Sequence, residues 1–247
     1  MSGRQPEQGE PGRRIRVWYT VGGKVRFLSH RDVARVMERA IRRAGVPVAY
    51  SLGYSPRPKV QYGLALSTGY ESDGEYIDIY LDPDREGVTD TAELALALTA
   101  CLPTGLDVTA AAEVAADEGS LQDSVDSTSW VVHVREVPYA ELSARVDALL
   151  TARSHEIEII RKGKPVREDL RPLLMELSVA TGADHCLLFA ELGTKPRSIR
   201  PSELLEALGV YEPLLVRRTH QWTRRDGNRG EPLGLDEPAP RAGLCAS

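Results

Sequence analysis

The sequence predicts an α+β protein built from two ferredoxin-like halves, each ordered strand, helix, strand, strand, helix, strand (βαββαβ), with disordered termini. Three observations predict this fold class. Apolar residues recur at helical spacing in several segments, alternating apolar residues surround those segments, and the order of elements repeats after an acidic stretch near the middle of the chain. With 247 residues, 42% of them hydrophobic and 27% charged, the chain can form one large or two small globular domains.

The predicted organisation has five parts. Residues 1–13 and 223–247 are rich in Gly, Pro and charged side chains without apolar periodicity, so we expect both ends to be disordered. The first ferredoxin-like half covers residues 14–117, and the second covers residues 130–222. Between them, the acidic segment 118–129 is expected to be a flexible linker.

The first half opens with one long strand or a strand pair over residues 15–28, turning at Gly22–Gly23. A helix follows, because the next apolar residues recur every three or four positions. Ser29 is the expected N-cap of this helix, Asp32 closes a capping box with it, and Gly45 is the expected end.

The remaining elements follow from the same two periodicities. In the first half we expect strands over residues 60–67, 75–81 and 106–114 and a helix over 91–102. In the second half we expect strands over 130–137, 156–160, 173–179, 187–192 and 214–219 and helices over 139–151 and 201–209.

The charge pattern along the chain is strongly uneven. Residues 13–62 hold 12 Lys or Arg against 2 acidic residues, a net charge of +10, whereas residues 63–129 hold 1 Arg against 15 acidic residues, a net charge of −14. Such blocks bear on binding partners rather than on the fold. Either the two blocks neutralise each other within one domain, or the basic block awaits an external anion.

The predicted first helix carries a basic face. Its arginines recur at offsets that place most of them on one side of the helix: Arg31, Arg35, Arg39, Arg42 and Arg43. Like charges at this spacing repel each other, so the face is either a solvated surface or a site where an anion or an acidic partner binds.

A proline- and glycine-rich loop follows this helix over residues 50–69. It interleaves aromatic, basic and amide side chains: Tyr54, Arg57, Lys59, Gln61 and Tyr62. Tyrosine rings can stack on bases, and Arg and Lys can contact phosphates. The helix and the loop together suit single-stranded or looped RNA, another phosphorylated ligand, or an acidic protein.

Two further groups are candidate anion sites. Lys195, Arg197 and Arg200 form a second basic loop before the helix at 201–209, whose backbone amides are expected to add to anion binding, unless the loop is merely a solvated turn. His30 stands at the start of the first helix, as a capping residue or beside a bound anion.

Acidic residues that follow the loop are expected to pair with nearby cations. Glu75 is expected to pair with Arg26 or Arg57. The remaining histidines, His133, His155, His185 and His220, are scattered singly, so we expect no metal site.

Two segments carry a resemblance to a known family. They are VRFLSHRDVARVMERAIRRAGVPVAYSLGYSPRPKVQYGLALSTGYESDGEYIDI and GTKPRSIRPSELLEAL. Both resemble signatures of the radical S-adenosylmethionine (SAM)-linked protein family, and the resemblance spans most of residues 15–220. Where many relatives have Phe-Asn-Pro-His, this chain has Tyr-Ser-Pro-Arg at 54–57, and arginine does not deprotonate. A binding role of the loop is compatible with that change, whereas proton transfer at Arg57 is not.

The resemblance implies a radical SAM protein as partner. In the family this domain is fused behind such a protein or is a separate chain beside one, and the enzymes carry a cysteine triplet for an iron–sulfur cluster. Here the cysteines are isolated, at Cys101, Cys186 and Cys245, so the resemblance implies the separate partner. We expect no cofactor, and the sequence contains no motif for nucleotide binding or nucleophilic catalysis.

These observations predict a non-catalytic partner of a radical SAM enzyme that binds tRNA, rRNA or another phosphate-bearing substrate. The alternative is an enzyme acting on a small anionic substrate in a pocket around His30, Arg26 and Lys59, between the two halves. A third reading is a scaffold whose basic face meets an acidic protein. No apolar run approaches the roughly 20 residues of a membrane-spanning helix, and residues 1–12 lack the apolar core of a secretory signal, so we expect a cytoplasmic protein without a membrane partner.

Overall fold

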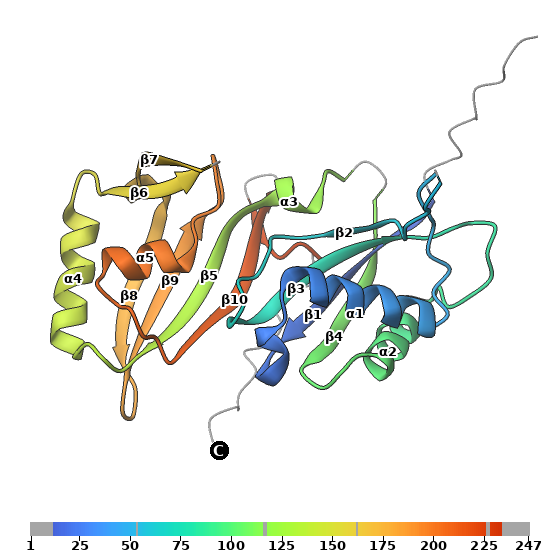
Figure 1. The fold of residues 1–247 in the computed structure, drawn as a ribbon, viewed down its shortest axis with the longest axis horizontal. Coiled ribbons are helices and arrows are strands. Elements are labelled where there is room, and N and C mark those ends of the chain that lie inside the picture. The colour runs from blue at the N-terminus through green and yellow to red at the C-terminus, as the bar shows by residue number, and fades with distance from the viewer. Residues whose placement is uncertain (1–11, 53, 116–117, 162, 226–227, 234–247) are drawn as a thin grey trace, which may run out of the picture. The chain divides into compact units, whose positions relative to one another are not determined.

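A computed structural model describes residues 12–52, 54–115, 118–161, 163–225 and 228–233 and confirms a mixed α+β protein (Figure 1). The chain divides into two compact units. Unit 1 comprises Met1–Gly69 and Glu75–Asp123, and unit 2 comprises Tyr70–Gly74 and Ser124–Ser247. No helix in the described ranges has both the length and the apolar character that crossing a membrane requires.

Unit 1 contains a four-stranded sheet and two long helices. Its elements are β1 (Arg14–Val21), a 3-10 helix η1 (Gly23–Phe27), α1 (His30–Arg43), β2 (Val60–Tyr62), β3 (Glu71–Tyr80), α2 (Thr91–Cys101), β4 (Leu106–Val114) and the short α3 (Leu121–Ser124). The strand order is β4-β1-β3-β2, with β4 antiparallel to β1 and β2 antiparallel to β3.

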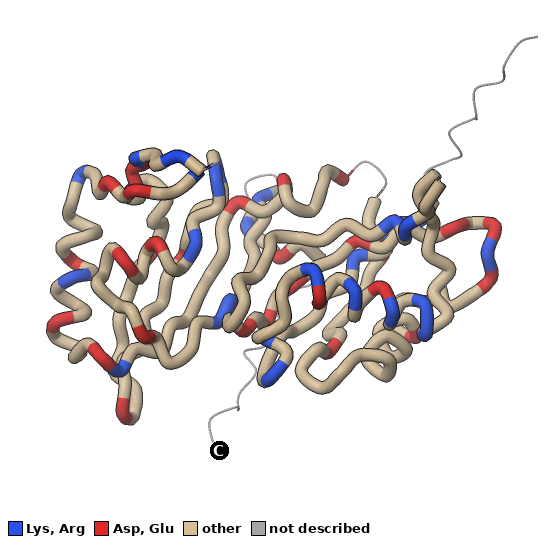
Figure 2. Tube along the Cα trace, in the orientation of Figure 1, with Lys and Arg blue, Asp and Glu red and all other residues tan. Residues whose placement is uncertain are grey.

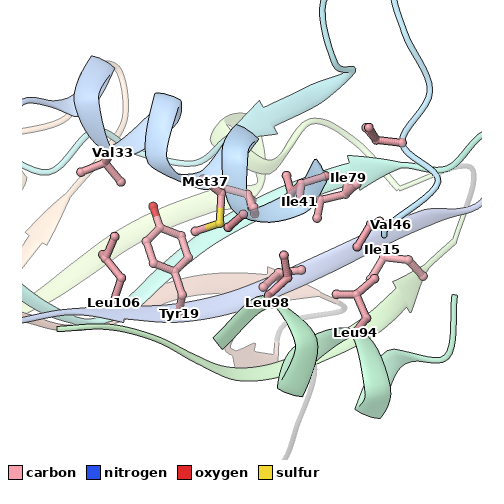
Figure 3. Packing of buried hydrophobic residues seen from close by; sticks show 14 of the residues in the cluster. Ile15, Tyr19, Val33, Met37, Ile41, Val46, Ile79, Leu94, Leu98 and Leu106 are labelled. Carbon is pink, nitrogen blue, oxygen red and sulfur yellow. The ribbon is translucent and has the colours of Figure 1, made fainter. Parts of the chain in front are cut away.

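The core of unit 1 lies between one face of this sheet and both helices. Alternate residues of β1, from Ile15 to Val21, belong to the same buried cluster as Met37 and Ile41 of α1 and Leu98 of α2. Figure 3 shows these helix side chains converging on the side chains of β1. Every second side chain of the strand and every third or fourth side chain of the helices therefore pack together in one apolar layer.

Helix α1 begins and ends where the sequence predicts. The backbone N–H of Asp32 donates to Ser29 Oγ at 3.2 Å, so Ser29 is the N-cap. At the other end Gly45 has a φ of 70°, and Val46 N–H donates to the carbonyl of Ile41 at 3.2 Å. This is a Schellman-type ending, for which glycine is favoured because the left-handed conformation strains other residues.

Unit 2 contains four further long strands that pair with one another, the short β11, and a separate two-stranded sheet. Its elements are β5 (Val125–Val134), α4 (Tyr139–Thr151), β6 (Glu156–Arg161), β7 (Lys164–Asp169), a 3-10 helix η2 (Arg171–Leu173), β8 (Leu174–Thr181), β9 (Cys186–Gly193), α5 (Pro201–Ala207), β10 (Leu215–Arg225) and β11 (Asn228–Gly230). The antiparallel order is β10-β5-β9-β8; β11 pairs with β10, and β6 pairs with β7. Glu71 and Ser72, at the start of β3, also belong to unit 2 and pair with β10 in parallel.

Several predicted elements are confirmed: the helices over 91–102 and 139–151, the strand over 106–114, and a helix that starts at Pro201. The single long strand or strand pair expected over 15–28 is wrong beyond Val21, because Gly23–Phe27 forms η1. In that segment Val25 is buried and Leu28 half-buried, a spacing of three that suits a 3-10 turn rather than strand alternation. Strand β7 was not predicted, because its sequence KPVRED has only one apolar side chain besides Pro165.

The expected linker over 118–129 is wrong. Residues from Leu121 form α3 and then β5, and Leu121 and Val125 are almost fully buried. Ser127 and Thr128 are buried as well, and Ser127 Oγ donates to Glu191 Oε1 at 2.6 Å. Polar composition therefore did not mean exposure here, because the buried hydroxyls have hydrogen-bond partners.

The expected disordered tail over 223–247 is also wrong at its start. Thr223 is buried within β10, and β11 returns beside that strand as a short hairpin. Thr223 Oγ1 donates to the carbonyl of Gly230 at 3.1 Å, which ties the two strands together. Residues 234–247, and residues 1–11 of the expected disordered N-terminus, lie outside the described residues.

Candidate functional site

The basic block of the sequence separates into two groups of arginines in unit 1. The first group lies on β1 and directly before it. Arg16 Nε is 2.7 Å and Arg16 Nη2 is 2.9 Å from the two carboxylate oxygens of Asp78. Arg16 also pairs with Glu118, and Arg13 pairs with Glu113 at 2.8 Å. The acidic block therefore neutralises the arginines of the strand.

The second group lies on α1 and is exposed: Arg31, Arg35, Arg39, Arg42 and Arg43. Figure 2 shows basic residues recurring along this helix. Arg35 forms an ion pair with Asp32 at 3.1 Å, and within the described residues the other four form none. The hydroxyl of Ser29 and the charge of Arg35 hold the pKa of Asp32 below its ordinary value, so Asp32 remains a carboxylate. Most of the cationic charge of this helix is therefore not compensated by the described carboxylates.

The loop after α1 is closed at its base. Tyr50 and Pro58 form a β-bridge, Ser51 N–H donates to the carbonyl of Arg57 at 2.8 Å, and Arg57 N–H donates to Ser51 Oγ at 3.0 Å. Tyr54 is fully in solvent, at 105% relative exposure, and Arg57 is exposed. The hydrogen bonds that close the loop thus hold its ends together, while an aromatic ring and a cation lie in solvent.

Lys59 and Gln61 both contact Tyr80, which was not among the predicted site residues. The Lys59 ammonium lies 4.6 Å from the centre of the Tyr80 ring, and the Tyr80 hydroxyl donates to Gln61 Oε1 at 3.0 Å. The signal was present in the alternation of β3, which places Tyr80 on the opposite face from the buried Ile79.

Tyr62 packs within unit 1, so its ring is not an exposed surface on which a base could stack. Its hydroxyl donates to the carbonyl of Ala34 at 3.2 Å, and its ring meets His30 edge-on, with centres 5.6 Å apart. Burial and the charge of Glu38 raise the pKa of Tyr62, so the phenol stays neutral. Tyr62 therefore connects β2 to the first half of α1.

Arg26, His30 and Glu75 line one small cavity within unit 1, together with mainly apolar side chains. The cavity volume is about 20 Å³, which is enough for one water molecule and far below the several hundred Å³ of a typical substrate pocket. Lys59, which the alternative enzyme hypothesis places in the same pocket, is not among the residues that line it.

The second basic loop is largely neutralised within unit 2. Lys195 pairs with Asp126 at 2.7 Å, and Arg197 pairs with Glu168 of β7 and with Glu203 at 2.8 Å. Glu203 also accepts a hydrogen bond from the backbone N–H of Arg200 at 3.1 Å, so this carboxylate occupies the helix start where an anion was expected. The pair of Arg197 with Glu168 was not expected, because the sequence did not predict β7.

No group of three or more His, Cys, Asp and Glu side chains suited to holding a metal ion occurs in the described part of the chain. Cys101 is half-buried and Cys186 is buried, and both are free thiols, whereas Cys245 lies outside the described residues.

Comparisons with known proteins place the chain in a family. The profile of a family described as "Uncharacterized protein conserved in bacteria (DUF2344)" matches residues 14–201. No curated protein matches the chain. Among solved structures, an unknown protein from Galdieria sulphuraria is similar at 10% identity over 80% of this chain and 88% of that chain, with a TM-score of 0.25, which is too low to support any argument. On the strength of the family match, which covers most of the sequence, the chain belongs to the uncharacterised bacterial family DUF2344.

Proposed function

We propose that this chain is a non-catalytic partner of a radical SAM enzyme, and that it binds tRNA, rRNA or another phosphate-bearing substrate. Binding takes place on the α1–loop surface of unit 1, which we define by Arg31, Arg35, Arg39, Arg42, Tyr54, Arg57, Lys59 and Gln61. The observation that carries the proposal is the exposed, mostly unpaired row of arginines on α1. The resemblance of residues 25–79 and 193–208 to the radical SAM-linked family supports the choice of partner.

The geometry of α1 suits an extended polyanion. At about 100° per residue, Arg31, Arg35 and Arg42 point within about 40° of one another, and from Arg31 to Arg42 the helix rises about 16 Å. The five arginines of α1 against Asp32 and Glu38 leave a net charge of +3 on the helix. Such a row can contact successive phosphates of one strand.

The loop adds a feature that a purely electrostatic partner does not require. Tyr54 is fully exposed three positions before the exposed Arg57, and base stacking on an exposed aromatic residue contributes about 1–3 kcal/mol per base. This combination favours single-stranded or looped RNA over an acidic protein. The water-sized cavity at Arg26 and His30 supports a binding role over catalysis on a small substrate.

We further propose that each unit is a ferredoxin-like domain. The strand orders β4-β1-β3-β2 and β10-β5-β9-β8 support this, because each places the first and third strands of a βαββαβ series at the centre of the sheet. In unit 2 the hairpin β6–β7 is an insertion between the first helix and the second strand of that series.

Binding of a fluorescent single-stranded oligoribonucleotide at several salt concentrations tests the function. Four phosphate contacts give a slope of log K against log salt of about −3, because single strands release about 0.7 counterions per contact. A slope near zero, or no binding at low salt, contradicts the proposal. Co-purification of nucleic acid with the full chain, identified by sequencing, then distinguishes tRNA from rRNA.

A further inference from the structure

Three side chains of unit 2 form a continuous chain of hydrogen bonds. Asp184 Oδ1 is 2.7 Å from His185 Nδ1, and His185 Nε2 is 2.8 Å from His133 Nδ1. The two imidazole rings are stacked with centres 4.8 Å apart. Arg135 binds the other oxygen of Asp184 at 2.6 Å and fixes that carboxylate. The fold thus brings together two histidines that stand 52 positions apart in the sequence.

The carboxylate of Asp184 determines which atoms donate and which accept in this series of hydrogen bonds. Hydrogen bonds from His185 and Arg135 hold the pKa of Asp184 below its ordinary value, so Asp184 is ionised and can only accept. His185 therefore carries its proton on Nδ1, and in its neutral form its Nε2 accepts from His133. It follows that His133 Nδ1 donates and that the lone pair of neutral His133 lies on Nε2.

His133 Nε2 is open to a ligand. No described residue forms a hydrogen bond with this atom, and the ring is only partly buried. Strand register places Leu187 of β9 and Leu215 of β10 directly beside His133, and both are half-buried. The site is therefore an oriented lone pair beside two half-buried leucines.

We propose that His133, aligned by His185 and Asp184, is the proton acceptor of a second binding site, which takes a small ligand bearing an N–H or O–H group next to an apolar part. The ligand donates this hydrogen to His133 Nε2. If the proton transfers, His133 becomes an imidazolium that still donates through Nδ1 to His185, and His185 still donates to Asp184. The ligand keeps the electron pair, and no other group changes its protonation.

The charged surroundings of His133 are consistent with a neutral acceptor. Arg217 of β10 disfavours a positive imidazole, and Glu71, which pairs with Arg217 at 2.6 Å, opposes that effect. Burial is the largest cause that lowers the pKa of His133. At neutral pH the lone pair on Nε2 is therefore available. This site belongs to unit 2 and does not depend on the RNA-binding proposal for unit 1.

The tautomer is measured by nitrogen-15 NMR of the full chain with labelled histidine at pH 7.5. The proposal predicts that His133 carries its proton on Nδ1 alone, whereas free imidazoles of histidine favour Nε2–H. Replacing Asp184 by Ala is expected to abolish the single tautomer. Arg153→Gln, at an exposed arginine of unit 2 that contacts none of these three side chains, is the control. If the Asp184 variant does not fold, the spectrum of the unmodified chain decides, because an Nε2–H tautomer of His133 overturns the proposal.

Ligand binding is tested with phenol and anisole, two flat apolar probes that differ in whether they carry an O–H. The proposal predicts that millimolar phenol shifts the Nε2 resonance of His133 and that anisole does not. Equal effects of the two probes, including no effect of either, contradict it.

Discussion

The guanidinium group of Arg16 donates two hydrogen bonds, of 2.7 and 2.9 Å, to the carboxylate of Asp78, and both side chains are 0% exposed. They extend from β1 and β3 on the face of the unit 1 sheet opposite α1 and α2. Glu118 adds a second carboxylate to Arg16. Such a buried pair is favourable only while both partners are present, because each charge has lost its water.

Replacing Asp78 by Ala is expected to lower the free energy of unfolding by about 3–5 kcal/mol, since it leaves Arg16 buried without its main partner. Urea denaturation followed by circular dichroism measures the change. Glu113→Ala is the matched control, because its pair with Arg13 is half-exposed and removing it is expected to cost about 0.2–1 kcal/mol. Similar losses for the two variants contradict this account.

This pair also shows how far the sequence predicts the structure. Alternation over residues 15–21 predicts a strand and places Arg16 opposite Ile15 and Val17. It cannot show that the second face of the strand is buried too, because the partner Asp78 lies 62 positions away. Charge counting therefore identified the basic block, but only the fold separates its paired arginines on β1 from its open arginines on α1.

The candidate site was predictable where local sequence determines geometry. Helix α1, its caps and its arginine face follow from local residue types and their spacing, as does the loop that is exposed at residues 51–52 and 54–57. The neutralisation of Lys195 and Arg197 was not predictable, because their partners Asp126 and Glu168 come from distant strands. The pairing of His133 with His185 was missed for the same reason.

The arginines of α1 are expected to carry most of the salt-dependent RNA affinity. Changing Arg35, Arg39 and Arg42 together to Gln removes three phosphate contacts and is expected to reduce the magnitude of the salt slope by about 2. Arg153 lies just after the end of α4, is exposed, and forms no ion pair among the described residues. Arg153→Gln is therefore the control, which removes a single charge outside the proposed surface. The idea fails if the triple variant and the control bind the oligoribonucleotide with the same slope. All four side chains are exposed, so the unfolding free energy is expected to change by at most about 0.5 kcal/mol per substitution.

Tyr54 is expected to contribute affinity without contributing stability. Its side chain is fully exposed, so Tyr54→Ala should leave the melting temperature unchanged. The same change is expected to weaken binding of a single-stranded oligoribonucleotide by about 1–3 kcal/mol, the value of one base stacked on an aromatic ring. Tyr54→Phe keeps the ring and should retain the affinity. Tyr211→Ala, at an exposed tyrosine of unit 2, is the matched control, and an equal loss for both alanine variants argues against stacking.

The stability of unit 2 is expected to depend on pH through His133. Burial, and secondarily the charges of His185 and Arg217, lower the pKa of His133 in the folded chain below the value of about 6.5 in an unfolded chain. The unfolded state therefore binds the proton more readily, so the contribution of His133 is fully present above about pH 6.5 and is lost as the pH falls through the lower folded pKa. Asp184, whose pKa is also lowered, loses its contribution only below about pH 3.9, so the two effects are separate.

Chemical denaturation at pH 8, 7, 6 and 5 measures this effect. The free energy of unfolding of the unmodified chain should fall from pH 7 to pH 5 more steeply than that of His133→Gln. The comparison uses slopes, because the substitution also alters the hydrogen bond to His185 and so changes stability at every pH. Equal slopes for the unmodified chain and His133→Gln mean that His133 is not held neutral by its surroundings, and the proton acceptor proposed for unit 2 then loses its electrostatic basis.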